Sequence, residues 1–187
     1  MIEINDKKNC CGCNACGDAC PVGAISFPSD NEGFWYPVVN REKCIECNLC
    51  QKVCPLLNLD SVKQYNQRNL QVFGGFNNNL AVRFESTSGG VFSALANAMY
   101  RQGGYVAGAI QKADFTVTNF ISNNKHDLSR LRSSKYVQSS AIGLYKKIKE
   151  LLEAGEQVLA CGSPCQMAAL RSYLGKEYNE LIIVILK

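Results

Sequence analysis

The sequence predicts two regions of different fold class: a small cysteine-rich α+β region over residues 1–57 and a larger α/β region over residues 72–187. Two observations carry this division. Nine of the eleven cysteines fall within the first 54 of the 187 residues. After residue 72, short apolar runs alternate with segments of helical periodicity, which is typical of a mostly parallel or mixed sheet covered by helices. Residues 58–71 are rich in Asn and Gln and predict a linker between the two regions.

An internal repeat organises the first region. Each copy has the spacing C-x2-C-x2-C-x3-C-P, which is the ligand run of two-cluster bacterial ferredoxins, where the fourth cysteine binds the other cluster. The repeat therefore predicts a ferredoxin-like domain with two 4Fe–4S clusters that exchange their fourth ligands. One cluster is expected on Cys10, Cys13, Cys16 and Cys54, and the other on Cys44, Cys47, Cys50 and Cys20.

Two other uses of these cysteines fit less well. Zinc sites take two Cys pairs, and neither copy of the repeat has that form. A secreted disulfide scaffold needs a signal peptide, and residues 1–6 have neither its basic nor its apolar segment. Cys11 stands outside the spacing and is expected to be a non-ligand cysteine. We expect a cytoplasmic protein whose cysteines stay reduced.

Charge and hydropathy exclude two further classes. The formal charge is +4, but Lys and Arg are scattered and the clusters add negative charge, so no nucleic-acid partner is expected. The longest apolar run, residues 181–186, is too short to span a membrane.

The second region is expected to alternate strands and helices. Strands are predicted at 72–76, 105–110, 115–121, 158–161 and 181–186, and helices at 91–101, 142–154 and 165–174. The last strand is followed only by Lys187, so the sequence indicates an incomplete domain, truncated from a longer protein.

Two glycine-rich turns offer binding sites by their chemistry alone. Ser88, Gly89 and Gly90 open a predicted helix, where backbone amides favour phosphate; the alternative is an ordinary N-cap and tight turn. Gly162 and Pro164 lie between a strand and a helix, where α/β folds bind ligands.

Single residues near these turns leave alternatives open. Lys135 is expected to pair with a phosphate or with a flavin ring, or else to be an exposed lysine. Cys165 is the candidate catalytic residue, as a nucleophile or redox thiol with a pKa lowered by the helix start. It could pair with Cys161, although a buried strand residue is the simpler interpretation of Cys161. His126 is expected at the surface, and Trp35 is expected to pack near the clusters.

Four ordered segments carry a resemblance to a known family. They are Ser86–Phe92, residues 104–108, Ser134–Tyr136 and Gly162–Gln166, and they are similar to the S-x-S-G-G, G-S-K-Y and G-T-P-C-Q motifs and the intervening strand of the coenzyme F-420 hydrogenase/dehydrogenase beta-subunit family. Ser133 replaces a glycine of that pattern and Ser163 a threonine. The family pattern continues beyond residue 186.

The resemblance implies a flavin-dependent oxidoreductase subunit. FAD would be held by Ser88, Gly89, Gly90, Lys135, Gly162, Pro164, Cys165 and Gln166, and electrons would pass between the clusters, FAD and a reducible small molecule, with a protein as redox partner. The alternative is a non-catalytic ferredoxin-type carrier with a partner-docking domain. A purely structural role for the clusters ranks last.

Overall fold

The computed structural model describes residues 1–60 and 71–185. The first region contains one 3-10 helix, two short α-helices and one small sheet. Its elements are η1 (Lys7–Asn9), α1 (Ala15–Asp18), β1 (Ile25–Ser26), β2 (Val38–Val39) and α2 (Leu49–Lys52). The two strands pair antiparallel. Helices α1 and α2 occupy the same place in the two cysteine motifs, so the sequence repeat is also a structural repeat.

The repeat extends to the backbone torsions. Gly12 and Asn14 have positive φ in the first motif, and Glu46 and Asn48 have positive φ at the matching positions of the second. The left-handed region is costly for residues other than Gly and Asn. Its use twice at the same positions turns each loop sharply between its cysteines.

A five-stranded sheet forms the centre of the second region. Its strands are β3 (Tyr105–Gln111), β4 (Val117–Ser122), β5 (Ser139–Ser140), β6 (Val158–Gly162) and β7 (Leu181–Ile185). They lie in the order β5-β4-β3-β6-β7. Only β3 and β4 pair antiparallel, and the other three neighbouring pairs are parallel. This arrangement confirms the predicted α/β class with a mostly parallel sheet.

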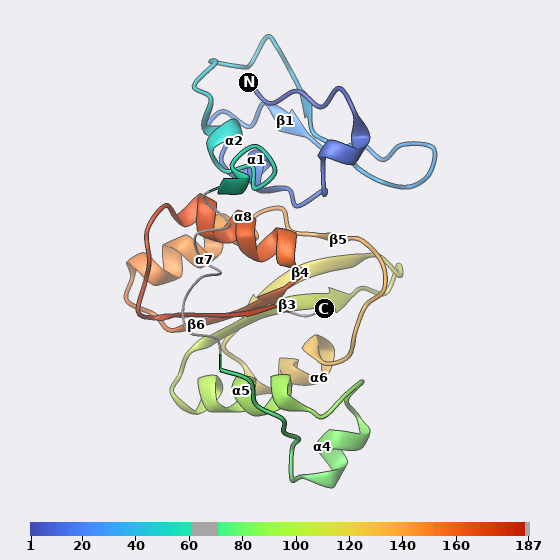
Figure 1. Cartoon of the computed structure of the whole chain (residues 1–187), viewed down its shortest axis with the longest axis vertical. Helices are drawn as coiled ribbons and strands as arrows, with labels where there is room; N and C mark the ends of the chain where they lie inside the picture. Colours follow the sequence, from blue (N-terminus) through green and yellow to red (C-terminus); the bar gives the residue numbers. More distant parts are fainter. Residues whose placement is uncertain (61–70, 186–187) are drawn as a thin grey trace.

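Helices cover both faces of this sheet (Figure 1). Helices α7 (Leu144–Glu153) and α8 (Pro164–Leu174) pack on one face, and α5 (Val91–Arg101) and α6 (Leu128–Leu131) on the other. Short helices α4 (Leu80–Phe84) and η3 (Lys125–Asp127) complete the region. Neighbouring strand residues divide the core: Val106 packs toward α5, and Ala107 toward α7.

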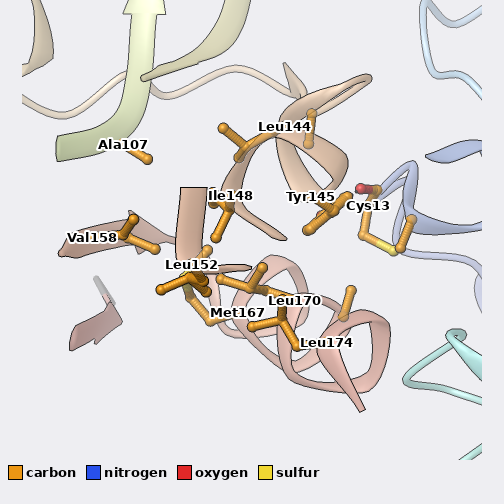
Figure 2. Packing of buried hydrophobic residues seen from close by; sticks show 14 of the residues in the cluster. Cys13, Ala107, Leu144, Tyr145, Ile148, Leu152, Val158, Met167, Leu170 and Leu174 are labelled. Carbon is orange, nitrogen blue, oxygen red and sulfur yellow. Dashed lines mark hydrogen bonds between the residues drawn. The ribbon is translucent and has the colours of Figure 1, made fainter. Parts of the chain in front are cut away.

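The cysteine-rich region packs on the α7 and α8 layer, on the side away from the sheet (Figure 1). Cys13, Ala15 and Val53 belong to the same hydrophobic cluster as the buried faces of α7 and α8. Figure 2 shows the side chains of this shared cluster. The two regions therefore bury apolar surface against each other, which stabilises their relative position.

Two predictions about local structure are wrong. Residues 72–76 form no strand: Val72 and Phe73 are 93% and 84% exposed, and no strand of the described chain pairs with them. Helix α5 has the predicted bounds, but its apolar period predicts a buried stripe of Val91, Phe92, Leu95, Ala98 and Met99, whereas the helix buries Ser93, Ala96 and Met99 and leaves Val91 half exposed. The face of a helix that is buried depends on where the sheet lies, which helical periodicity does not specify.

The predicted linker, residues 58–71, lies mostly outside the described residues. Within the described residues, no helix combines the length and the apolar character that crossing a membrane requires.

Candidate functional site

Two small cavities lie inside the cysteine-rich region, one lined by five cysteines and the other by four. The first is lined by Cys10, Cys13, Cys16 and Cys54 and also by Cys11, and the second by Cys20, Cys44, Cys47 and Cys50, with mostly apolar side chains in the rest of both walls. Among the cysteines of the C-x2-C-x2-C-x3-C spacing, each cavity thus takes three from one motif and the fourth from the other. The grouping is the one expected when two clusters exchange their fourth ligands.

The cysteine sulfurs in these cavities accept backbone hydrogen bonds. The amide of Gly12 donates to Cys10 Sγ at 3.4 Å, that of Ala24 to Cys20 Sγ at 3.2 Å, and that of Ile2 to Cys50 Sγ at 3.2 Å. Amide donors to thiolate sulfur stabilise negative charge and raise the reduction potential of an iron–sulfur cluster. The surroundings therefore suit thiolate ligands of a cluster.

Cysteines from both motifs are neighbours in space. Burial, together with the neighbouring Cys10, Cys54 and Cys50, raises the pKa of the Cys16 thiol to about 12. Among the described residues, no three His, Cys, Asp or Glu side chains converge on a point that would hold one metal ion. A cubane does not require such convergence, because each thiolate binds a different iron atom.

The loop of the first cavity is attached to the α7 layer by two buried hydrogen bonds. The hydroxyl of Tyr145 donates to the Cys13 carbonyl at 2.6 Å, and the amide of Ala141 donates to Asn14 Oδ1 at 2.9 Å. Tyr145 is fully buried and Asn14 is 1% exposed. Buried hydrogen bonds of this kind are costly to break, so the loop is held firmly on the second region.

Asp18 of α1 caps the start of α7 across the same interface. Its carboxylate accepts backbone N–H bonds from Gly143 at 2.6 Å, Tyr145 at 3.0 Å and Lys146 at 3.4 Å. These amides have no partner within the helix, so a carboxylate there satisfies them and complements the helix dipole. Partial burial raises the pKa of Asp18, although the three amide donors oppose that shift.

Removal of this cap has an expected cost. Asp18→Ala should lower the free energy of unfolding by about 1–3 kcal/mol, because three helix amides lose their acceptor. Asp18→Asn should cost less, since its amide oxygen still accepts. Because folding raises this pKa, protonation of Asp18 favours the folded state. The stability that this protonation adds is therefore present below the ordinary Asp pKa and is lost as pH rises through the raised value, whereas the three hydrogen bonds of the cap remain at neutral pH.

Urea unfolding of the three proteins over an acidic pH series measures both effects. The Asn variant should lack the part of the pH dependence that Asp18 contributes. Equal stability of the wild type and the Ala variant at neutral pH would show that the cap contributes nothing.

A larger cavity of about 610 Å³ lies beside the first cluster loop. Its wall includes Cys11 and Gly12 of that loop, Gly108 of β3, and Gly162 at the end of β6. The carboxyl end of a parallel strand is the usual place for a ligand in an α/β sheet. The volume is in the ordinary range for a small-molecule or cofactor site. The cavity therefore places any bound molecule next to the predicted cluster ligands.

The start of helix α5 lines one side of this cavity. Gly90, with φ of 75°, precedes the helix and provides no side-chain cap for its first amides. Gly89, Val91 and Ser93 line the cavity with it, as does Ser88. An uncapped helix N-terminus presents unpaired N–H groups and partial positive charge, both of which favour an anion.

Two cationic side chains lie on the same cavity wall. Lys135 Nζ donates to the carbonyls of Arg130 at 2.8 Å and Arg132 at 2.6 Å, and burial lowers its pKa. Arg132 donates from Nε to Ser93 Oγ at 3.1 Å and forms an ion pair with Glu85. The sequence motifs did not indicate Arg132, although it directly precedes residues 133–136. Lys135 is therefore half-buried and hydrogen-bonded, and it is not a freely exposed lysine.

The start of helix α8 brings Ser163, Cys165 and Gln166 to the cavity. Gln166 Oε1 accepts the Ser163 amide at 3.2 Å, and its Nε2 donates to Ser139 Oγ at 2.9 Å. The amide group of Gln166 therefore joins the helix start to β5. Pro164, which was expected to bind the cofactor, begins the helix and is not among the residues that line the cavity.

The Cys165 thiol differs from its expected state. Its pKa is raised, chiefly by a hydrogen bond with the Cys11 thiol and then by burial, so the predicted lowering by the helix start is wrong. The sulfur of Cys165 lies 3.2 Å from Ser163 Oγ, and the cysteine that raises its pKa is Cys11 and not Cys161. Cys161 is a buried residue of β6, as expected, and burial raises its pKa to about 11.

Two other predicted placements agree with the structure. His126 is exposed in η3. Trp35 Nε1 donates to the Gly12 carbonyl at 3.2 Å, so the indole supports the first cluster loop. Gly12 has φ of 64°, and a Cβ there would lie 2.1 Å from Gln138 Nε2. Only glycine fits this turn without displacing the side chain beside it.

Comparison with known proteins agrees with the first region. Residues 9–57 match the family described as the 4Fe-4S dicluster domain. Together with the cysteines that line the two cavities, this match supports the class of iron–sulfur electron-transfer proteins. No curated protein matches the chain.

Proposed function

We propose that this chain is a flavin-linked oxidoreductase subunit, in which Cys10, Cys13, Cys16 and Cys54 bind one 4Fe–4S cluster and Cys20, Cys44, Cys47 and Cys50 bind the other. The proposed domains are residues 1–57 for the clusters and 72–187 for the flavin, as the resemblance to the F-420 hydrogenase/dehydrogenase beta-subunit family implies. The observation that carries this proposal is the cavity of about 610 Å³ between the first cluster loop and the sheet.

The cavity has the chemistry that a flavin nucleotide requires. The uncapped start of α5 at Gly90 suits a phosphate, and Lys135 and Arg132 add positive charge on the same wall. A flavin accepts two electrons and releases them singly, so it links one-electron clusters to a two-electron substrate. In this proposal Ser88, Gly89 and Gly162 allow close approach of the ligand, and Lys135 directs its remaining N–H bond toward it.

Flavin binding provides the test. FAD should bind to the anaerobic, cluster-loaded protein, with quenched flavin fluorescence. Lys135→Met should raise the dissociation constant about 10- to 100-fold, because a charge-assisted hydrogen bond contributes about 1.5–3 kcal/mol. Lys147→Met, which changes an exposed lysine of α7, serves as the matched control and should leave the affinity unchanged.

Comparison of FAD with riboflavin separates the phosphate subsite from the ring subsite. Riboflavin should bind more weakly to the wild type, and Lys135→Met should reduce that difference if the lysine contacts a phosphate. Absence of FAD binding at high flavin concentration, with both clusters present, would refute the proposal.

A second candidate function is a non-catalytic electron carrier that docks a partner. The observation in its favour is a row of exposed apolar side chains over residues 72–84, namely Val72, Phe73, Phe76, Leu80 and Phe84. Exposed apolar surface of this kind is typical of an interaction site. This function requires reversible cluster reduction without turnover of any deazaflavin or nicotinamide, and such turnover would exclude it.

A further inference from the structure

The side chain of Asn14 is buried beside the first cluster cavity, and its amide nitrogen has no hydrogen-bond partner. Asn14 is 1% exposed and lines the cavity that contains Cys10, Cys13, Cys16 and Cys54. Its Nδ2 atom is itself buried, and the described part of the chain provides no acceptor for it. An unpaired buried donor is costly, so folded proteins rarely leave one without a partner.

The orientation of this amide is fixed by its oxygen. Asn14 Oδ1 accepts the backbone N–H of Ala141 at 2.9 Å. Exchanging the oxygen and the nitrogen would make two N–H donors face each other, so the nitrogen lies on the side of the amide away from Ala141. Asn14 also borders an outer groove with Phe27 and Phe34, but Nδ2 is inaccessible to solvent, so water in that groove does not pair with it.

The contents of the cluster cavity supply the acceptor that this nitrogen lacks. Beyond the cysteines and Gly12, the cavity is lined by side chains without oxygen, namely Ile2, Ile4, Phe27, Pro37 and Leu56. Thiolate and sulfide sulfurs of a 4Fe–4S cluster accept N–H bonds, and the Cys10 sulfur already accepts one from the backbone of Gly12. The unpaired donor therefore fits a cluster bound in this cavity.

The second motif has an asparagine at the matching position, and its side chain is used differently. Asn14 and Asn48 precede α1 and α2 with φ of 64° and 58°, and neither side chain caps its helix. Asn48 is exposed, and its Oδ1 accepts from the Met1 amino group at 2.7 Å. The two motifs thus share a backbone, but only the first has an amide buried against the second region.

We propose that Asn14 Nδ2 donates a hydrogen bond to the first 4Fe–4S cluster, at a sulfide or a ligand thiolate, and thereby raises its reduction potential. The cluster gains one negative charge when it accepts one electron, and an N–H donor beside sulfur stabilises that charge. Because Ala141 holds the same amide, the packing of the second region sets the position of this donor. The inference rests on the cluster ligands of the proposed function and is independent of flavin.

Redox titration monitored by EPR tests the proposal on anaerobic protein with both clusters. Asn14→Gly removes the donor, and glycine adopts the positive φ without strain. Asn14→Asp also removes the donor but keeps an acceptor for the Ala141 amide. In Asn14→Gly the equilibrium constant for one-electron reduction of the first cluster should fall about tenfold, which lowers its midpoint potential by about 59 mV. Asn14→Asp should lower it further, because a carboxylate adds negative charge.

Two further variants control and assign the titration. Asn48→Gly makes the same change at the matching torsion of the second motif and should leave the midpoint of the first cluster unchanged. Cys10→Ala removes the first cluster, so the signal that remains identifies the second. Iron and sulfide are counted in every sample, which separates a shifted cluster from a lost one.

Isotope labelling reads the hydrogen bond directly. With ¹⁵N only in the side-chain amides of asparagine, pulsed EPR of the reduced wild type should show a ¹⁵N coupling to the first cluster. This coupling should disappear in Asn14→Gly and in Cys10→Ala and persist in Asn48→Gly. Because the coupling is measured on the wild type, the test holds even if both Asn14 variants lose the cluster.

The outcomes that contradict the proposal are distinct. An unchanged midpoint of the first cluster in Asn14 variants that retain both clusters overturns it. An equal fall in the midpoints of both clusters also overturns it, because the effect would then belong to the whole domain. Absence of the ¹⁵N coupling in the loaded wild type has the same consequence. A wild type that binds no iron would instead refute the proposed cluster ligands themselves.

Discussion

Replacement of Cys54 by alanine is expected to remove the cluster of the first motif, although Cys54 belongs to the second. The cavity that Cys54 lines is shared with Cys10, Cys13 and Cys16, and the other cavity holds none of these residues. Iron should fall from about eight atoms per chain to about four, because one 4Fe–4S cluster loses its fourth thiolate. Iron and sulfide analysis of anaerobically reconstituted protein measures the change.

Double variants distinguish exchanged from unexchanged ligands. Cys10→Ala with Cys54→Ala should remove the same cluster as either single change and leave about four iron atoms. Cys44→Ala with Cys54→Ala should remove both clusters. If each motif instead held its own cluster, these two results would be reversed, so the pair of experiments decides the assignment without a structure of the loaded protein.

Replacement of Tyr145 by alanine is expected to destabilise the contact between the two regions more than any other change on α7. The ring is fully buried between the cluster loop and α8, with its centroid 6.0 Å from that of Tyr173. Figure 2 shows Tyr145 beside Cys13 in this cluster. Loss of a buried aromatic side chain costs about 3–5 kcal/mol, partly through the cavity that remains. Anaerobic denaturant unfolding of the loaded protein measures the loss.

The conservative variant separates packing from hydrogen bonding. Tyr145→Phe retains the ring but loses the donor to the Cys13 carbonyl, and it should cost about 1 kcal/mol. Burial raises the pKa of the Tyr145 hydroxyl well above its ordinary value, so it remains a donor at neutral and alkaline pH. If Tyr145→Ala and Tyr145→Phe both lowered the free energy of unfolding by the same small amount, the interface would contribute little to stability. Faster amide exchange at Asn14 and Asp18 in Tyr145→Ala would locate the loss at the interface.

Together these contacts make the first cluster loop part of the cavity wall. Cys11 and Gly12 of this loop line both the large cavity and the cavity of the first predicted cluster. A molecule in the cavity would therefore be separated from the first cluster by little more than the loop itself. Such proximity suits transfer of electrons between the relay and the second region.

Local patterns predicted most elements of the second region. The helix at 91–101 and the strands and helices that follow residue 104 have bounds within a few residues of those predicted. Short elements were not predicted, such as the two-residue strand β5 and the five-residue helix α4, because they contain too few residues to show a period. Residues 72–76 are apolar but form no strand, since a strand requires a partner that local sequence does not specify.

The sequence alone determined the chemistry of the cysteine-rich region, because cluster ligation depends on spacings of two and three residues that are written along the chain. It also indicated which turns carry binding residues, since glycine, proline and helix starts are local features. Only the tertiary structure decided which of these turns share a cavity, and that the first cluster loop meets the start of α8 there. The physical reason is that this contact joins segments of the two regions. It therefore depends on how the two regions pack across Tyr145, Asn14 and Asp18.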